Sequence, residues 1–349
     1  MVKGQQPFQR RFFLLWRRDE RGTTILNVSL NALPRPLSGL IERYGTALAG
    51  LALIIFFAIF APNFSSPSNL LNILKDTSFL AILALGFMLA LTIAELDLSI
   101  AEVASLCAVT AGALIHAKWD PALATLAALA VGAACGAFNG FGVTVLRVPS
   151  LIVTLGTAAI AKGLAFAITQ GVSFVGRWPT SFTGLARGTL FMIPNLVLWL
   201  VGAALGTWFL LKWTRTGSHM IAVGEAEEAA RLSGIQTARM KRLGLFLAGL
   251  LAGLTAILLA SSLSSAAPNM AGDYFLYAIA AVLLGMTMFE PGRPNVPGTV
   301  FAAVVLKVLG NGLILLGASY YVQDIVLGAI IIGSVAFSAS VVKKAAFKV

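Results

Sequence analysis

Few residues in this sequence could carry chemistry by themselves, and familiar catalytic patterns do not occur. No lysine is followed by serine or threonine, which excludes the GxxxxGK[ST] phosphate-binding loop. Neither HExxH nor GxSxG is present. The two histidines and two cysteines lie in separate segments and form no metal-binding pattern. The sequence therefore predicts a chain that is no enzyme, has no cofactor or metal of its own, and hydrolyses no ATP.

A second group of candidates consists of polar side chains within or beside long apolar runs. Amide and hydroxyl groups there can face a cavity and bind a polar solute, or they can form hydrogen bonds between helices. We interpret these residues as a candidate substrate pathway, made of Asp97, Asn139, Thr154, Thr157 and Asn311.

Asp97 belongs to a polar break between two apolar segments. The segment Ser99-Ile100-Ala101-Glu102 matches a capping box, which predicts that a new helix starts at Ile100 after irregular backbone. Irregular backbone at membrane depth is tolerated only beside protein or a watery cavity. Two readings of Asp97 remain open: a buried pathway residue or a solvated turn residue.

A third candidate is the segment GEAEEAARLSGI at residues 224–235. Its glutamates suit the first turn of a short helix, Glu227 and Arg231 have i,i+4 spacing, and Gly234 can end the helix. Because such a short helix is marginal in water, it must pack against something. That surface is either a partner protein or the end of the chain's own membrane domain.

The elements that position these residues are membrane-spanning helices. Of 349 residues, 58% are hydrophobic and 11% are charged, and the mean hydropathy is +0.89, which leaves too little polar surface for a soluble protein. A spanning helix needs about 20 apolar residues. The runs predict an all-α polytopic protein with about ten spans and one broken or re-entrant segment: Tyr44–Leu74, Thr77–Ala94, Val103–Ala117, Ala122–Leu146, Ser150–Gly171, Gly188–Leu211, Leu243–Gly272, Tyr274–Phe289, Pro297–Ser319 and Ile325–Val342.

The positions of lysine and arginine predict the orientation. With the N-terminus inside, nineteen of them fall on the cytoplasmic side and four outside, Lys75 among the four. Both termini and the loop at residues 212–242 are therefore expected in the cytoplasm. The predicted organisation is a basic N-terminal segment at 1–43, a transmembrane domain at 44–342 and a tail at 343–349. Phe8–Arg18 is either a helix on the membrane surface or a disordered tail.

Four segments together resemble a known family. GEAEEAARLSGI, PSLIVTLGT at 149–157, LDLS at 96–99 and NGLILLG at 311–317 are similar to the ribose-type branch of bacterial ABC importer permeases for sugars. The resemblance runs from about Ile41 to Ala339. Two places depart from the family pattern: Ala94 and Glu95 stand where glycines are usual, and only some of the glycines expected around Phe289 are present.

The resemblance implies how the loop at 224–235 works. In that family it resembles the EAA-type coupling element, which docks into a groove on a separate ATPase. The coupling residues are then Gly224, Glu225, Glu227, Glu228, Ala229, Ala230, Arg231 and Gly234.

The resemblance also implies the function and the partners. The chain would be the permease subunit of an ABC importer of a monosaccharide or related polyol in the bacterial inner membrane. Its partners would be an ABC ATPase that binds the ATP, a periplasmic substrate-binding protein, a second permease subunit and membrane lipid, with no nucleic acid.

An ion-coupled secondary transporter is the alternative, although it would need carboxylates deep in the spans. A channel or scaffold would need no docking helix.

Overall fold

The computed structural model describes the backbone of residues 35–346, and the side chains of residues 44–319 and 321–334. The chain divides into two units, Met1–Glu42 and Arg43–Val349, and the fold described below is that of the second. The segment Phe8–Arg18, for which a surface helix was one reading, lies outside the described residues.

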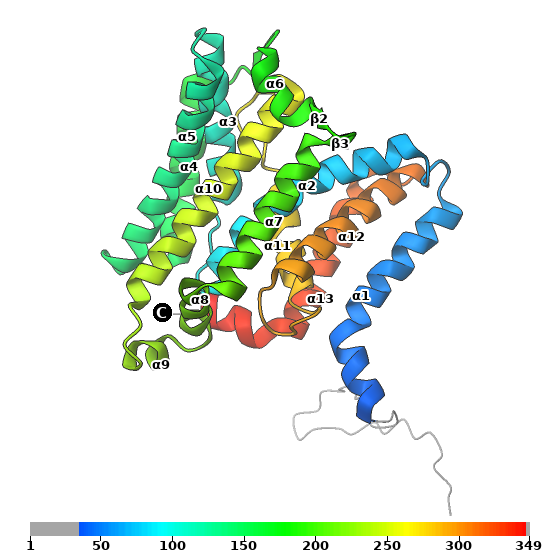
Figure 1. The fold of residues 1–349 in the computed structure, drawn as a ribbon, viewed down its shortest axis with the longest axis vertical. Coiled ribbons are helices and arrows are strands. Elements are labelled where there is room, and N and C mark those ends of the chain that lie inside the picture. The colour runs from blue at the N-terminus through cyan, green and yellow to red at the C-terminus, as the bar shows by residue number, and fades with distance from the viewer. Residues whose placement is uncertain (1–34, 347–349) are drawn as a thin grey trace, which may run out of the picture. The chain divides into compact units, whose positions relative to one another are not determined.

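The described chain is almost entirely helical (Figure 1). The helices are α1 Arg35–Phe60, α2 Pro67–Thr92, α3 Ile100–His116, α4 Pro121–Thr144, α5 Ser150–Thr169, α6 Thr180–Arg187, α7 Asn195–Trp213, α8 Arg215–Glu225, α9 Glu227–Leu232, α10 Thr237–Leu263, α11 Tyr274–Gly285, α12 Val296–Leu315 and α13 Tyr320–Ala346. Two antiparallel pairs of two-residue strands join the connections: β1 Phe174–Val175 with β4 Ser265–Ala266, and β2 Thr189–Leu190 with β3 Ile193–Pro194.

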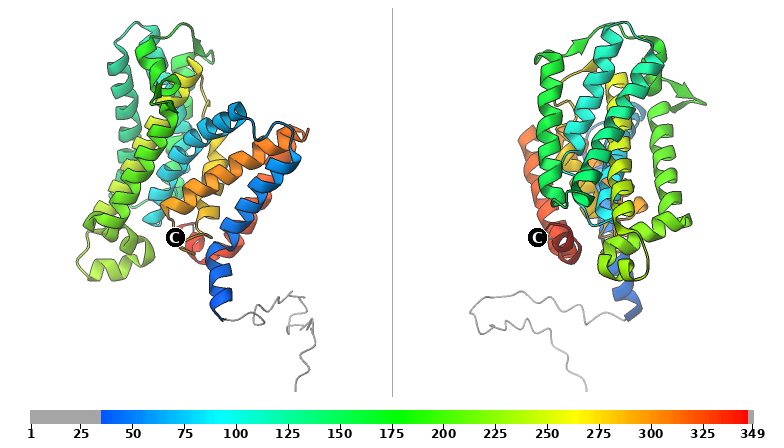
Figure 2. Two further views of the ribbon diagram at one scale, coloured as in Figure 1. Left: turned by 45° about the vertical axis from the view of Figure 1, so that its right-hand side comes forward. Right: turned by 90° about the vertical axis from the view of Figure 1, so that its left-hand side faces the viewer.

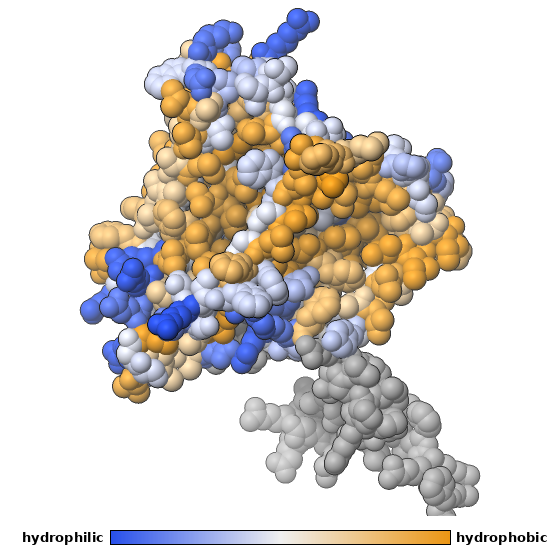
Figure 3. Space-filling model, viewed as in Figure 1, coloured by the Kyte–Doolittle hydropathy of each residue, from blue (hydrophilic) through white to orange (hydrophobic). Residues whose placement is uncertain are grey.

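The lengths and composition of these helices are those of a membrane protein. Among the described residues, α2, α4, α5, α7, α10 and α12 are long and apolar enough to cross a membrane, and shorter apolar stretches lie in α1, α3, α11 and α13. Hydrophobic side chains cover the flanks of the helices, whereas hydrophilic ones gather near α8 and α9 and at the opposite loops (Figure 3). The prediction of an all-α membrane protein is confirmed at this level.

Several predicted boundaries are wrong. The charge-free run Tyr44–Leu74 is not one span, because the chain turns after Phe60 and α2 begins at Pro67. Ser66 caps α2 by accepting a hydrogen bond from the Asn69 N–H, and proline suits the first helical position because it has no N–H to satisfy. Lys75 therefore lies inside α2 and not in an outer loop. The connection between the predicted spans Ser150–Gly171 and Gly188–Leu211 contains α6, and α13 continues past residue 342.

The core is centred on α2, whose residues from Thr77 to Thr92 are all buried. Helix α10 packs against α2, α3 and α4. Glycines let α4 and α10 come close, because a Cβ at Gly132 or Gly136 would collide with the α10 backbone at Gly249 or Leu245. This close packing fixes α4, and thereby Asn139, against the centre of the bundle.

The polar break between α2 and α3 occurs where expected, but its local structure differs. Residues 93–99 are not helical, and α3 begins at Ile100. Ala94 makes the turn in the left-handed region, with φ of 55°. The prediction of a capping box is wrong, because Ser99 makes no capping hydrogen bond. Its hydroxyl donates to Asp97 Oδ1 instead. Buried partners from other helices therefore hold this segment.

Candidate functional site: the α8–α9 end and the buried polar break

The predicted coupling segment forms the end of α8 and the short helix α9, not one helix. Gly224 and Glu225 end α8, Ala226 has extended backbone, and α9 runs from Glu227 to Leu232. Only Glu227 and Glu228 lie in the first turn of α9. Both helices lie together at one end of the bundle in every view (Figures 1 and 2).

Glycines shape this segment at two points. A Cβ at Gly224 would collide with the Thr92 carbonyl oxygen, so α8 lies directly against the end of α2. Gly234 has φ of 83° and follows α9, where a residue with a side chain would be strained. The prediction that Gly234 ends the helix is confirmed.

The ion pairs of α9 involve its glutamates and Arg231. Arg231 binds Glu228 at 2.6 Å, and the charge of Glu227, the partner expected from the i,i+4 spacing, acts on it as well. The hydrogen bond and charge of Glu228 raise the pKa of Arg231 above its ordinary value. This pair is exposed and adds little to stability. Glu227 forms its ion pair with Lys241 of α10.

Only part of α9 is available to a partner. Ala230 is 5% exposed and packs within the hydrophobic core of the chain, so its side chain faces inward. Ala229 is exposed, and Leu232 is 80% exposed. A single exposed apolar residue is common on a protein surface, so Leu232 is singled out only because it lies on the exposed side of the helix that the sequence predicts to dock. The sequence reasoning missed Leu232, although it lies one turn of helix from Glu228 and Ala229, on the outward face.

Lys241 connects α9 to the buried break. Its Nζ lies 2.8 Å from Glu95 Oε1 and 2.8 Å from Glu227 Oε1. Lys241 and Glu95 are buried, and Glu227 is about two-thirds covered. Breaking a buried pair by removing one partner costs about 3–5 kcal/mol. One lysine on α10 therefore ties the outer helix to the segment that holds Asp97.

Four of the five predicted pathway residues meet at this break. Asn139 on α4 donates to Ser99 Oγ at 2.9 Å and to Asp97 Oδ1 at 3.4 Å. Its own Oδ1 accepts from the Thr157 hydroxyl of α5 at 2.6 Å. The Thr154 hydroxyl of α5 lies 2.8 Å from the Ser150 carbonyl oxygen of its own helix and 3.2 Å from the Leu96 carbonyl oxygen, and Ser150 Oγ accepts from the Leu96 N–H at 3.2 Å.

This cluster is closed to solvent. Asp97, Asn139, Thr154 and Thr157 are all buried, and Asp97 Oδ1, the Asn139 amide and the two threonine hydroxyls form hydrogen bonds to one another, to Ser99 or to the backbone. The solvated-turn reading of Asp97 is wrong. Buried, satisfied polar groups fix one arrangement of helices, so the cluster joins the break to α4 and α5.

Asn311 lies elsewhere. It forms a reciprocal amide pair with Asn69, with two hydrogen bonds of 2.9 Å that join α12 to α2. The structure thus gives Asn311 the interhelical role that the sequence left open, and does not bring it to the Asp97 cluster.

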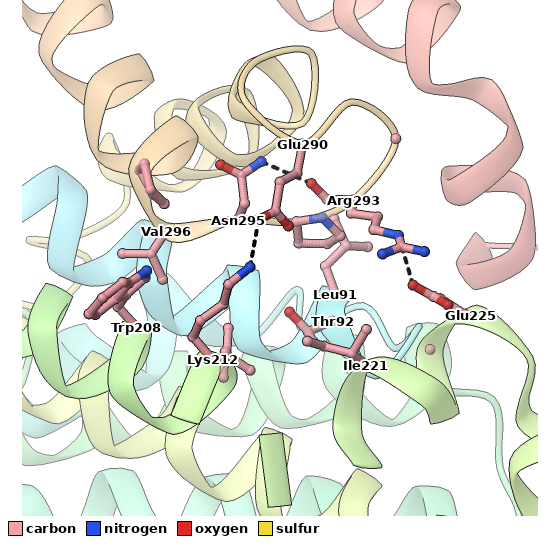
Figure 4. Close-up of a pocket in the computed structure, with 15 residues that line it drawn as sticks. Leu91, Thr92, Trp208, Lys212, Ile221, Glu225, Glu290, Arg293, Asn295 and Val296 are labelled. Carbon is pink, nitrogen blue, oxygen red and sulfur yellow. Dashed lines mark hydrogen bonds and ion pairs between the residues drawn. The ribbon is translucent and has the colours of Figure 1, made fainter. Parts of the chain in front are cut away.

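A cavity of about 360 Å³ lies between α7, α8, the end of α2 and the α11–α12 connection (Figure 4). Two ion pairs close over it: Lys212 of α7 with Glu290 at 3.3 Å, and Glu225 of α8 with Arg293 at 2.8 Å. Both pairs are largely exposed. They attach the α11–α12 connection to the α8–α9 end, so Glu225 contacts its own chain.

Comparison with known proteins shows which family the chain belongs to. Residues 69–335 match the family described as branched-chain amino acid transport system / permease component. The chain belongs to this family. It is 37% identical over 293 residues to the ribose import permease protein RbsC of Escherichia coli K12, covering 82% of the chain and 90% of that protein. It is 33% identical over 297 residues to the L-arabinose transport system permease protein AraH of the same strain, covering 85% and 90%.

A solved structure shares the fold. An inward-facing conformation of a metal-chelate type ABC transporter matches with a TM-score of 0.51 and 15% identity, covering 88% of this permease and 98% of the other chain. At that identity the likeness concerns the fold alone. The resemblance to ribose-type permeases noted in the sequence is confirmed by the relatives.

Proposed function

We propose that this permease is the transmembrane subunit of an ABC importer that moves a monosaccharide or related polyol into the cytoplasm. Relatives named for ribose, L-arabinose and D-allose transport, each matched over about nine-tenths of its length, support the substrate class. The observation that carries the mechanism is α9, a short helix with an exposed apolar residue on one side and a buried ion pair on the other.

The proposed membrane arrangement has ten spans, namely the six long apolar helices and the four shorter ones, with both termini in the cytoplasm. Arg215, His219, Arg239 and Arg242 line one cavity beside α8 and α10, and basic residues of this kind favour the cytoplasmic side. The proposed location is the bacterial inner membrane, which the bacterial sources of the relatives support. A second permease subunit would complete the pathway, and a periplasmic binding protein would deliver the sugar.

In the proposed mechanism an ATPase seats α9 in a groove and moves it when ATP is bound and hydrolysed. Because Lys241 bonds both Glu227 and Glu95, displacement of α9 pulls on the segment that holds Asp97. That segment is bonded to α4 and α5 through Asn139 and Thr154. Movement at α9 thereby reaches helices that cross the membrane.

The energy source separates this proposal from an ion-coupled transporter. We expect uptake of labelled ribose, arabinose or allose by cells to stop when ATP is depleted with the proton gradient intact. Uptake that continues under these conditions would favour the secondary transporter.

The proposed orientation, with α8 on the cytoplasmic side, can be tested by cysteine labelling. A cysteine at Ser218, introduced into α8 as Ser218→Cys, should not react with an impermeant maleimide added outside intact cells, and should react after the inner membrane is opened. Asp120→Cys, at the start of α4 and the opposite end of the bundle, is the matched control and should react from outside. Labelling of Ser218→Cys in intact cells would reverse the topology.

A further prediction concerns Asp97. An asparagine at this position keeps an Oδ1 that can accept from Ser99 and Asn139, so Asp97→Asn should fold and assemble with the ATPase. We expect its sugar uptake to fall about tenfold, because a charge-assisted hydrogen bond is roughly twice as strong as a neutral one and the break is held less firmly. Uptake at the wild-type rate would leave Asp97 with no role beyond the turn.

A further inference from the structure

A second polar region lies away from the Asp97 cluster, between α11, α12 and α13. A cavity of about 840 Å³ is lined there by Asp273, Tyr274, Tyr277, Lys307, Gln323 and Asp324, with Leu276, Leu327 and two glycines. Sites for small ligands have volumes of about 300–1,000 Å³ and combine apolar walls with a few polar groups. The cavity therefore has the size and lining of a ligand site.

Lys307 is a charged residue for which the fold supplies no hydrogen-bonding or ion-pair partner in the part of the chain that the structure describes. It is the one charged side chain in the apolar helix α12. Its Nζ lies 4.6 Å from the ring centre of Tyr274 and 5.5 Å from that of Tyr277. Among the described residues it has no hydrogen bond and no ion pair within 4 Å, so the N–H groups that do not face the two rings are available to a ligand.

Charge near the middle of a membrane span is not compatible with a lipid-facing surface. A lysine at the centre of a spanning helix costs about 2.5–3.5 kcal/mol in hydrocarbon. The charges of Asp76 and Asp273 also act on Lys307, and that of Asp324 acts on Tyr277. By contrast, the exposed side of α1 is apolar, with Leu48, Ile55 and Ile59. The charged side of α11–α13 therefore faces water or protein.

The chemistry of the lining selects a class of ligand. Carboxylates and the Gln323 amide can accept hydrogen bonds from hydroxyl groups, while Lys307 can donate to them, and tyrosine rings can cover the C–H faces of a sugar. Two carboxylates against one ammonium disfavour an anionic ligand such as a sugar phosphate. The Asp97 cluster is less suited to bind a sugar, because its residues are buried and its amide and hydroxyl groups are bonded to each other.

We propose that this cavity binds the neutral sugar during its passage through the permease, with Lys307 and Gln323 as hydrogen-bonding partners of its hydroxyl groups. This inference rests on the proposed function, since it locates the substrate of that importer. It adds a site on α11–α13 to a pathway that the sequence placed around Asp97.

Protection from labelling tests the site directly. In a chain with Cys107→Ala and Cys135→Ala, a reporter cysteine is introduced as Leu276→Cys, which lines the cavity without a proposed bond to the ligand. Excess D-ribose, L-arabinose or D-allose should slow the reaction of this cysteine with a maleimide in the purified complex. Leu263→Cys, exposed at the end of α10 and outside the cavity, is the control and should react at an unchanged rate.

Substitution then tests the residues. Lys307→Met should abolish protection of the reporter and lower uptake about tenfold, the expected loss of a hydrogen bond to a charged group. Lys162→Met, which alters a lysine in the apolar helix α5, should leave both unchanged. Thermal unfolding of Lys307→Met, expected to match wild type, separates a binding role from a structural one.

The outcomes separate the inference from the proposed function. If none of the three sugars is imported by the wild-type complex, the proposed function fails. If one is imported but does not protect the reporter, and Lys307→Met imports it normally, the inference is overturned while the function stands. Protection by the cation putrescine but by no sugar would also overturn it, because the cavity would then select positive charge.

Discussion

Replacement of Leu232 with aspartate is expected to separate the ATPase from this permease. Leu232 is the most exposed large apolar residue of α9. Burial of a leucine in a partner's groove is worth about 2 kcal/mol, so its loss alone weakens binding about thirtyfold. The new carboxylate must also lose its water, which increases the effect. The ATPase should no longer copurify with Leu232→Asp.

The matched control is Val172→Asp, which places the same charge at another exposed apolar residue. Val172 is 70% exposed and lies between α5 and β1. Helix α6, which follows β1, lies at the other end of the bundle from α9 (Figure 1). This variant should retain the ATPase. If Leu232→Asp retains it equally well, α9 is not the docking helix, and α9 only covers the end of the membrane domain.

Lys241→Met is expected to uncouple ATP hydrolysis from transport. The variant keeps the length of the side chain but removes both bonds from Lys241 to Glu95 and Glu227. It also leaves the buried Glu95 carboxylate without its partner, at a cost of about 3 kcal/mol in the free energy of unfolding. The assembled complex should bind and hydrolyse ATP, whereas sugar uptake should fall at least tenfold.

Loss of stability could imitate this result, so a second variant separates the two effects. Lys241→Met combined with Glu95→Gln removes the unpaired charge, and should recover most of the thermal stability without recovering uptake. Lys118→Met, which removes an exposed lysine that follows α3, should leave both quantities within error. Normal uptake by the stabilised double variant would mean that Lys241 holds the fold together but transmits no movement.

The sequence predicted the class of fold because membrane spans depend mainly on local composition. The apolar runs located α4, α5 and α12 within a few residues. The run from Tyr44 to Leu74 was misread because the turn after Phe60 contains no charge, and charge was the criterion for a boundary. The same error put Lys75 in an outer loop, whereas it lies inside α2.

Only part of the candidate site could be predicted from the sequence. The contacts that could not be predicted join residues that are far apart along the chain. Asn139, Thr154 and Thr157 were identified as isolated polar residues, but their meeting with Asp97 depends on the tertiary packing of α4 and α5. The sequence of α9 alone does not show which of its sides faces the bundle. The pair of Glu227 with Lys241 depends on the position of α10, and the inward position of Ala230 depends on the packing of the hydrophobic core.

The most direct test of the account is accumulation of sugar by the purified system. The permease is reconstituted in liposomes with its ATPase inside and its binding protein outside, without any ion gradient. With ATP enclosed, labelled ribose, arabinose or allose should accumulate above its outside concentration, and a nonhydrolysable ATP analogue should give none. Accumulation that requires an imposed ion gradient and ignores ATP would contradict the assignment of this chain as an ATP-driven importer.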